Sequence, residues 1–204
     1  MAIRSSRRAF QALQALATDQ AGYVTAKQAA RLGYTYPHLS YHVAAGNFER
    51  AGHGLYRVAH VPLSEHDDLV RLTFWSRDRS GAPQAVASHR TALVLHELTE
   101  LLPDSIHLTV PRRFQKAPPS GCVLHRAELA AEDVETREGF LVTKPVRTLV
   151  DVADSDVPQD ELRKSVRAAL ERGTVRRTAL ISAVRGTPGE ARLLRALPAA
   201  RRSR

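Results

Sequence analysis

Cysteine, aromatic side chains and long apolar runs are all scarce in this 204-residue chain. The single cysteine, Cys122, excludes an intramolecular disulfide and a four-cysteine metal site. No apolar stretch is long enough to span a bilayer, and no hydrophobic segment follows the basic start MAIRSSRRAF as it would in a signal peptide. We therefore expect a cytoplasmic protein that does not enter a membrane.

The motifs of nucleotide chemistry are also missing. The chain has neither the GxxxxGK[ST] nor the GxGxxG pattern, and no Asp-x-Asp pair falls on a clear strand where it would hold Mg²⁺. Helix-end chemistry accounts for His66-Asp67-Asp68, and the pair His89 and His96 lacks a third metal ligand at suitable spacing. We expect no enzyme, no cofactor and no metal site. A nucleotidyl-transfer or nuclease activity in residues 61–204 is the less favoured alternative.

The net charge of +9 is distributed unevenly along the chain. Residues 1–60 contain seven Lys or Arg against two Asp or Glu, and residues 161–204 contain twelve against three. Residues 61–160 reverse the sign, with eleven against sixteen. A basic first module fits a polyanionic partner, whereas the acidic middle indicates a second module with another task. With 43% apolar residues for its cores, the chain is expected to form two domains, 1–60 and 61–204.

Residues 22–58 predict two short helices in tandem. Thr25 and Gln28 have the spacing of a capping box at the start of the first helix, and Gly33 can end it with a positive φ. The second helix is expected over Tyr36–Ala45, with Pro37 near its first position, where the missing N–H has no cost.

A small hairpin follows, with strands at 48–50 and 55–58 around the Gly52-His53-Gly54 turn. Helix, turn, helix and β-ribbon in this order match a winged helix-turn-helix, with residues 36–45 as the recognition helix. An ordinary helical hairpin with an exposed helix is the structural alternative.

Leu39 and Val43 are expected to point inward, which turns a polar and aromatic face of the recognition helix outward. Basic side chains around it would contact phosphates, because this helix itself has no Arg or Lys. For the amino-terminal arginines, a solvated terminus is an equal alternative. The residues expected to contact DNA are Arg4, Arg7, Arg8, Thr25, Lys27, Gln28, Arg31, Thr35, Tyr36, His38, Ser40, Tyr41, His42, Arg50, His53 and Arg57.

The rest of the chain predicts a mixed α/β domain with a small sheet and carboxy-terminal helices, so that the whole protein is α+β. Arg147 and Asp151 have i, i+4 spacing on one helix, and would be an organising contact if buried. The expected helices begin near Ser64, at Ser88 (ending near Thr99), at Pro145, and over 159–172, 176–184 and 188–197. The expected strands are 85–87, 106–110, 123–125 and 139–142.

Several blocks in this order resemble the AbiEi-like antitoxins of bacterial type IV toxin–antitoxin systems. They are the winged-helix stretch 22–58, ASHRTALVLHELTE with IHLTVPRR after it, and GFLVTKPVRTLVDVAD. The resemblance covers most of the chain, and its middle blocks are more specific than the winged helix. Residues that match the family's blocks, and that we interpret as scaffold, are Ser88, His89, Thr91, Leu93, Arg147, Thr148 and Asp151.

The resemblance implies that the winged domain binds double-stranded DNA repeats upstream of its own operon and represses it. It also implies that the second domain counteracts a nucleotidyltransferase-like toxin. A dimeric or cooperative mode of DNA binding stays open. The alternatives are a solitary winged-helix regulator without a toxin, and a module whose winged helix meets protein instead of DNA.

Overall fold

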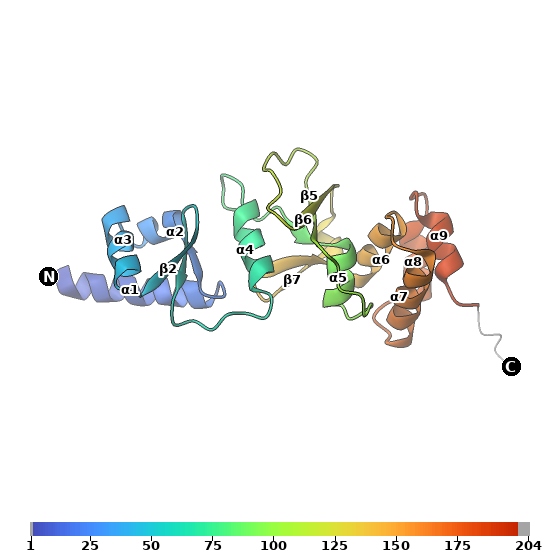
Figure 1. The fold of residues 1–204 in the computed structure, drawn as a ribbon, viewed down its shortest axis with the longest axis horizontal. Coiled ribbons are helices and arrows are strands. Elements are labelled where there is room, and N and C mark those ends of the chain that lie inside the picture. The colour runs from blue at the N-terminus through green and yellow to red at the C-terminus, as the bar shows by residue number, and fades with distance from the viewer. Residues whose placement is uncertain (1, 200–204) are drawn as a thin grey trace. The chain divides into compact units, whose positions relative to one another are not determined.

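The computed structural model describes residues 2–199, with the side chains of the first helix described from Arg7 onward. The chain divides into two compact units between Trp75 and Ser76. Each unit is built on its own sheet and its own hydrophobic core (Figure 1). The expected α+β class, a winged helix-turn-helix followed by a mixed α/β unit, is confirmed.

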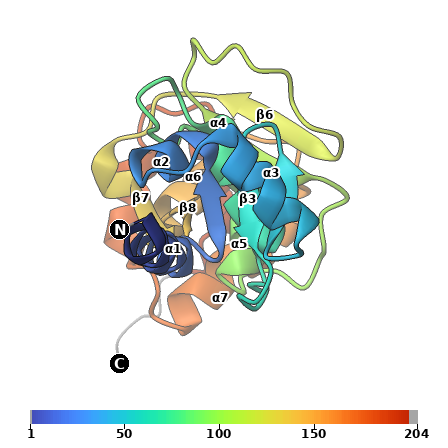
Figure 2. The ribbon, with the colours of Figure 1, turned by 90° about the vertical axis from the view of Figure 1, so that its left-hand side faces the viewer.

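The first unit consists of three helices, a small sheet and a fourth helix at its end (Figures 1 and 2). Its elements are α1 (Ala2–Thr18), β1 (Tyr23–Thr25), α2 (Ala26–Arg31), α3 (Tyr36–Ala44), β2 (Phe48–Gly52), β3 (Leu55–Val58) and α4 (Asp67–Ser76).

The start of α2 follows the local signal in the sequence. Thr25 Oγ1 accepts from the backbone N–H of Gln28 at 3.2 Å, and Gln28 Oε1 accepts from the Thr25 N–H at 2.9 Å. This reciprocal pair is the predicted capping box, and it satisfies two amides at the start of the helix. Gly33 follows α2 with φ +88°, as expected of a residue that ends a helix in the left-handed region.

Strand β3 is the central strand of the first sheet, whose order is β1-β3-β2. Strand β1 was not predicted, because three residues are too short to show a periodic pattern. It pairs antiparallel with β3 from Tyr23↔Arg57 to Thr25↔Leu55, and β2 forms the other side of the hairpin. The core behind the sheet contains Leu13, Ala17, Val24, Ala29, Tyr34, Leu39, Phe48, Tyr56 and Val58.

Helix α4 belongs with the first unit, so the division falls later than the boundary expected after residue 60. The Tyr23 hydroxyl donates to Asp67 at 2.8 Å, the Tyr23 and Phe74 rings lie 5.7 Å apart, and Arg71 donates to the Ala51 carbonyl at 3.3 Å. Burial, with the Asp67 hydrogen bond, raises the pKa of Tyr23 to about 12. Tyr23 and Asp67 are 44 residues apart in the chain, so no local pattern could have indicated their contact.

The second unit combines a five-stranded sheet with a group of helices (Figure 1). The sheet order is β6-β5-β4-β8-β7, with β5/β6 and β4/β8 parallel and the pairs β4/β5 and β7/β8 antiparallel. The strands are β4 (Val86–Ala87), β5 (Ile106–Val110), β6 (Cys122–Arg126), β7 (Val134–Arg137) and β8 (Phe140–Thr143). The helices are α5 (His89–Leu95), the 3₁₀ turn η1 (Ala131–Asp133), α6 (Pro145–Ala153), α7 (Gln159–Glu171), α8 (Arg177–Val184) and α9 (Glu190–Ala196).

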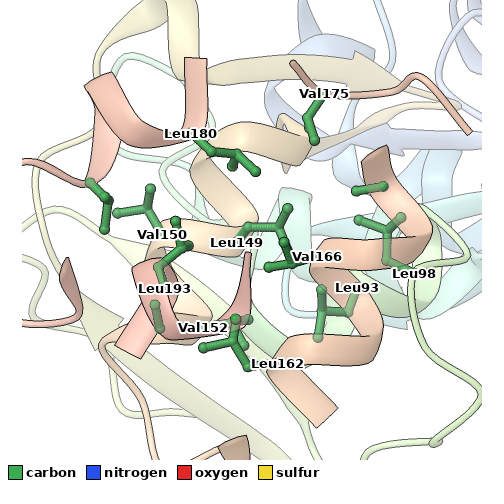
Figure 3. Packing of buried hydrophobic residues seen from close by; sticks show 14 of the residues in the cluster. Leu93, Leu98, Leu149, Val150, Val152, Leu162, Val166, Val175, Leu180 and Leu193 are labelled. Carbon is green, nitrogen blue, oxygen red and sulfur yellow. The ribbon is translucent and has the colours of Figure 1, made fainter. Parts of the chain in front are cut away.

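The core of the second unit lies among α5 to α9. Figure 3 shows Leu149 of α6 and Leu193 of α9 pointing toward side chains from α7 and α8. Leu149, Leu162, Leu180 and Leu193 are all fully buried. Helix α5 ends at Leu95, earlier than expected, because Glu97 adopts a left-handed φ of +55° and turns the chain.

Candidate nucleic-acid interface

The outer face of α3 carries the most exposed aromatic residues of the first unit. Tyr36 is 65% and Tyr41 is 68% exposed, and His38 and Ser40 are exposed with them. Pro37, Ala44 and Ala45 are exposed as well. The two alanines add little bulk to this face. The serine and tyrosine hydroxyls and the His38 imidazole supply hydrogen-bonding groups.

The inner face of α3 contains Leu39, which is 2% exposed, and also His42. His42, which was predicted to contact DNA, is partly buried on this face. Its ring lies 5.0 Å from the ring of Phe48 and 5.7 Å from that of Phe10, and its Nδ1 is 3.2 Å from Asn47 Nδ2. Burial lowers the pKa of His42, as an apolar environment does for a basic group. His42 therefore anchors α3 to the core of the first unit.

Helix α3 begins with Thr35 as its N-cap residue. The backbone N–H of Thr35 donates to Nδ1 of His38 at 3.5 Å, which gives His38 the reciprocal role in a second capping box. Thr35 itself is exposed at this end of the helix. The sequence predicted both residues for DNA contact, but it did not indicate that His38 also caps the helix.

Exposed cations lie on the elements around α3. Lys27 and Arg31 are exposed on α2, and Arg50 is exposed on β2 of the hairpin. The exposed His53 is in the turn of the same hairpin, where Gly54 has a φ of +64°. Lys27, Arg31 and Arg50 each carry a positive charge at the end of a flexible stem on the surface of the unit.

The amino-terminal arginines lie on α1. Arg7 and Arg8 are exposed there, whereas the side chain of Arg4 falls outside the described residues. Between them, the exposed residues of α1 and α2 account for most of the positive charge expected of this module.

Arg57 was expected to contact DNA from the hairpin, and the structure places its side chain in contacts within the first unit. It is 7% exposed on the central strand β3, donates to the Val61 carbonyl and lies 3.6 Å from Glu49. Three consecutive residues of β3, Tyr56 to Val58, are buried, and the sequence did not show that a further strand, β1, pairs with β3 on the side opposite β2. Arg57 is thus a structural residue of the wing.

Thr25 and Gln28 were expected to serve both as a helix cap and as DNA contacts. Their polar atoms bond each other, and Gln28 Nε2 also donates to Gln20 Oε1 at 2.8 Å. Both residues are partly buried. The polar side-chain atoms of Thr25 and Gln28 are therefore bonded within the unit, whereas Lys27, which lies between them in the sequence, is exposed.

In the second unit, Ser88 and His89 join a stack of imidazoles at the β4–α5 junction. Ser88 Oγ accepts from Thr109 Oγ1 at 2.8 Å and lies 3.0 Å from His89 Nδ1. The His89 ring stacks on that of His125 with 3.5 Å between centroids, and His107 Nδ1 is 2.9 Å from His125 Nε2. The stack explains why this position holds a histidine although its φ is +51°.

Burial controls the protonation of these rings. It lowers the pKa of His89 to about 3 and that of His125 to about 4, and neighbouring imidazoles add to both shifts. It also lowers the pKa of His107. Within residues 2–199 no group of three or more His, Cys, Asp or Glu is placed to hold a metal ion.

The other family-block residues connect α5 and α6 to the sheet. Thr91 Oγ1 accepts from the His107 N–H at 2.8 Å, and Thr148 Oγ1 donates to the Thr143 carbonyl at 2.9 Å. Arg147 bonds Asp151 at 2.7 Å and Asp133 at 3.2 Å.

Sequence reasoning missed His107, His125, Phe10, Tyr34 and Asn47 as partners of the predicted residues. His107 and Thr109 are two residues apart on β5 and therefore lie on the same face, and Thr109 pairs with His125 of β6. A correct prediction of this strand pairing would have brought the imidazoles together. Nothing local to Phe10 indicated that it would stack on His42.

Fold and surfaces together define a winged-helix protein whose second domain is a mixed α/β scaffold. Residues 11–59 match the family described as "Transcriptional regulator, AbiEi antitoxin", and residues 85–197 match "AbiEi antitoxin C-terminal domain". The chain therefore belongs to the AbiEi antitoxin family, as its sequence blocks indicated. Both descriptions name regulator or antitoxin domains rather than enzymes.

Comparison with curated proteins finds no matching relative. Among the helices of residues 2–199, none has the length and apolar character needed to cross a membrane.

Proposed function

We propose that this protein binds double-stranded DNA upstream of its own operon through α3 and represses transcription, while its second domain counteracts a nucleotidyltransferase-like toxin. The proposal depends above all on the outer face of α3, where Tyr36, His38, Ser40 and Tyr41 are exposed. Exposed Lys27, Arg31 and Arg50, together with Arg7 and Arg8, supply cations on the neighbouring elements.

The division of labour between these groups follows from their chemistry. Cations on flexible stems neutralise phosphates regardless of sequence and release counterions, which makes binding depend on salt. Rings, hydroxyls and imidazole on a helix in the major groove meet base edges, and these contacts distinguish sequences. Since α3 has no Lys or Arg, affinity and specificity are expected to come from different elements.

DNA binding is tested by fluorescence anisotropy with a labelled duplex from the upstream region and a scrambled duplex of equal composition. Tyr41→Ala should reduce the preference for the upstream duplex, by about 1–3 kcal/mol if Tyr41 makes a good base contact. Lys27→Gln should weaken binding to both duplexes and reduce the slope of log K against log salt by about 0.9.

The matched control is Arg185→Gln, which removes one exposed positive charge from the second unit. It should leave the slope unchanged if binding uses the winged domain and not net charge alone. If the wild-type protein does not bind the upstream duplex at low salt, the alternative that the winged helix binds a protein instead of DNA is favoured. A duplex bound equally well by Tyr41→Ala would exclude the α3 assignment.

Antitoxin action is tested separately by co-expressing the full chain with the product of the adjacent gene and measuring growth. Tyr41→Ala should still protect the cells, because neutralisation is assigned to the second domain. Protection lost together with DNA binding would contradict that assignment. An adjacent gene whose product is harmless alone would identify a solitary regulator instead.

A further inference from the structure

The capping contact at the start of α3 determines which nitrogen of His38 carries a proton. A backbone N–H can only donate, so the ring nitrogen that receives the Thr35 N–H, Nδ1, must be the unprotonated one. In a neutral imidazole the other nitrogen, Nε2, then carries the hydrogen. The 3.5 Å contact therefore favours the Nε2–H tautomer of the neutral His38 ring, with a donor at the far end of an exposed ring.

The position of His38 makes that donor useful. His38 is the third residue of α3, and the amino-terminal residues of a recognition helix are the ones that contact base edges. The capping contact also limits rotation of the ring about its side-chain bonds, because turning it would leave the Thr35 amide without its acceptor. The Nε2–H group is thus pre-oriented before any DNA is bound.

The second histidine of α3 lies one turn further along the helix. His42 Nδ1 is also near a donor, Asn47 Nδ2 at 3.2 Å, but its ring is enclosed by Phe10, Tyr34 and Phe48. Only the first of the two combines a fixed tautomer with an exposed ring.

We propose that His38 reads a base-edge acceptor in the major groove by donating a hydrogen bond from Nε2–H. This inference rests on the proposed DNA-binding function and assigns one element of its specificity. The acceptors open to such a donor are N7 of a purine, O6 of guanine and O4 of thymine, whereas cytosine presents an N4 amino group at the same edge. His38 therefore selects against cytosine at one position of the operator.

The tautomer is tested on the free, full-length protein by long-range ¹H–¹⁵N correlation NMR, with His38→Asn used to assign the signal. We expect an unprotonated Nδ1 and a protonated Nε2. An Nδ1–H tautomer would overturn the proposal. Because no DNA is present, this measurement is independent of the proposed function.

The reading role is tested with variants that separate the cap from the outward donor. In His38→Asn, Oδ1 takes the place of Nδ1 and keeps an acceptor for Thr35, while the group that reaches the base is lost. We expect about a three- to tenfold loss of affinity for the upstream duplex, the size of one neutral hydrogen bond, and no change for the scrambled duplex. His60→Asn, which changes an exposed histidine outside the predicted DNA contacts, is the matched control and should not change the preference between duplexes.

The contacted base is located by replacing each base pair of the upstream duplex in turn. One position should disfavour cytosine with the wild-type protein and lose that preference with His38→Asn. A 7-deazapurine at that position reports N7 if it causes the same loss, and an unaffected duplex reports O6 or O4. An equal loss on both duplexes, or no position that changes, would overturn the reading role.

These outcomes are distinguishable from failure of the proposed function. If the wild-type protein binds neither duplex, DNA binding and the reading role fail together, whatever the tautomer. If it binds the upstream duplex and His38→Asn binds with the same base preferences, only the assignment of His38 fails. Thermal unfolding of His38→Asn close to that of the wild type confirms that the variant tests contact and not folding.

Discussion

Arg147 lies 2.7 Å from the carboxylate of Asp151, one turn further along α6, and the second oxygen of that carboxylate is buried with no hydrogen-bond partner in the described chain. Burial raises the pKa of Asp151 to about 6, outweighing the opposing attraction of Arg147. Asp133 adds a second partner to the guanidinium at 3.2 Å. The sequence predicted that this pair would organise the domain if buried, and Asp151 is 8% exposed.

Removing the cation is predicted to destabilise the second unit most at neutral pH. Arg147→Met leaves the Asp151 carboxylate buried and unpaired, which costs about 3–5 kcal/mol in free energy of unfolding. Since Arg147 holds the pKa of Asp151 down to about 6, its removal raises that pKa further, so the loss should shrink as the pH falls toward 6 and be smallest below it, where the carboxyl is protonated in both proteins. Urea unfolding at pH 7 and pH 5, followed by circular dichroism, measures the difference.

The control for this variant is Arg163→Met, which removes the cation of the exposed i, i+3 pair with Asp160. An exposed pair contributes less than about 1 kcal/mol, so this variant should be nearly neutral at both pH values. Equal losses for the two variants would show that the buried pair has no special role in α6.

The imidazole stack is predicted to make the second unit sensitive to acid. The folded pKa values of His89 and His125, about 3 and about 4, lie below the ordinary value of 6.5, so the unfolded chain binds more protons below pH 6.5. Stability is therefore full above about pH 6.5 and decreases as the pH falls toward 4, by about 1.4 kcal/mol per pH unit for each fully excluded proton. The charged groups near the stack are Arg90, Asp156 and Arg147.

His89→Asn is the informative variant, because Asn tolerates the left-handed backbone that His89 adopts at φ +51°. It should lower the free energy of unfolding at pH 7 through lost ring packing, yet make stability fall less steeply between pH 6 and pH 4. The measurement is a series of chemical unfolding curves over this range. A pH dependence as steep as in the wild type would exclude His89 as a proton-excluding group.

The close approach of α9 to α6 is predicted to require glycine at position 189. A Cβ at Gly189 would lie 2.6 Å from the carbonyl carbon of Ala153, although the φ of −80° is one that any residue can adopt. Gly189→Ala should therefore destabilise the protein by about 1–3 kcal/mol through overpacking. Gly173→Ala, at a φ of +69° with open space around it, tests backbone strain instead of packing.

Local signals in the sequence were sufficient for the helix-turn-helix and most of the second domain. Thr25 and Gln28 lie within one turn of each other, so their capping box could be predicted without knowing the fold. The outward face of α3 followed from the 100° step once Leu39 was assigned to the core. The positions of His38 and Tyr41 on that face could be predicted for the same reason.

Features that depend on pairing between distant segments could not be predicted. Arg57 is a basic residue of the hairpin, as a phosphate contact would be. Only the pairing of β1 with β3 places it at the centre of a sheet. His42 has the same local pattern as His38, and the difference between them depends on Phe10, which lies 32 positions earlier in the chain. The division after Trp75 likewise depends on a distant contact, because the bond from Tyr23 to Asp67 joins α4 to the first unit.

Arg50 and Arg57 provide the sharpest separation between DNA contact and structure, since both are arginines of the same hairpin. Arg50→Gln removes an exposed charge and should reduce the slope of log K against log salt by about 0.9, with a change in free energy of unfolding within about 0.5 kcal/mol. Arg57→Gln should do the reverse, because it removes the contacts to Val61 and Glu49 from a residue that is 7% exposed. Anisotropy titrations at several salt concentrations, paired with urea unfolding of both variants, measure the two effects. A loss of salt dependence in Arg57→Gln without a loss of stability would mean that β3 opens to place this side chain on the phosphate backbone.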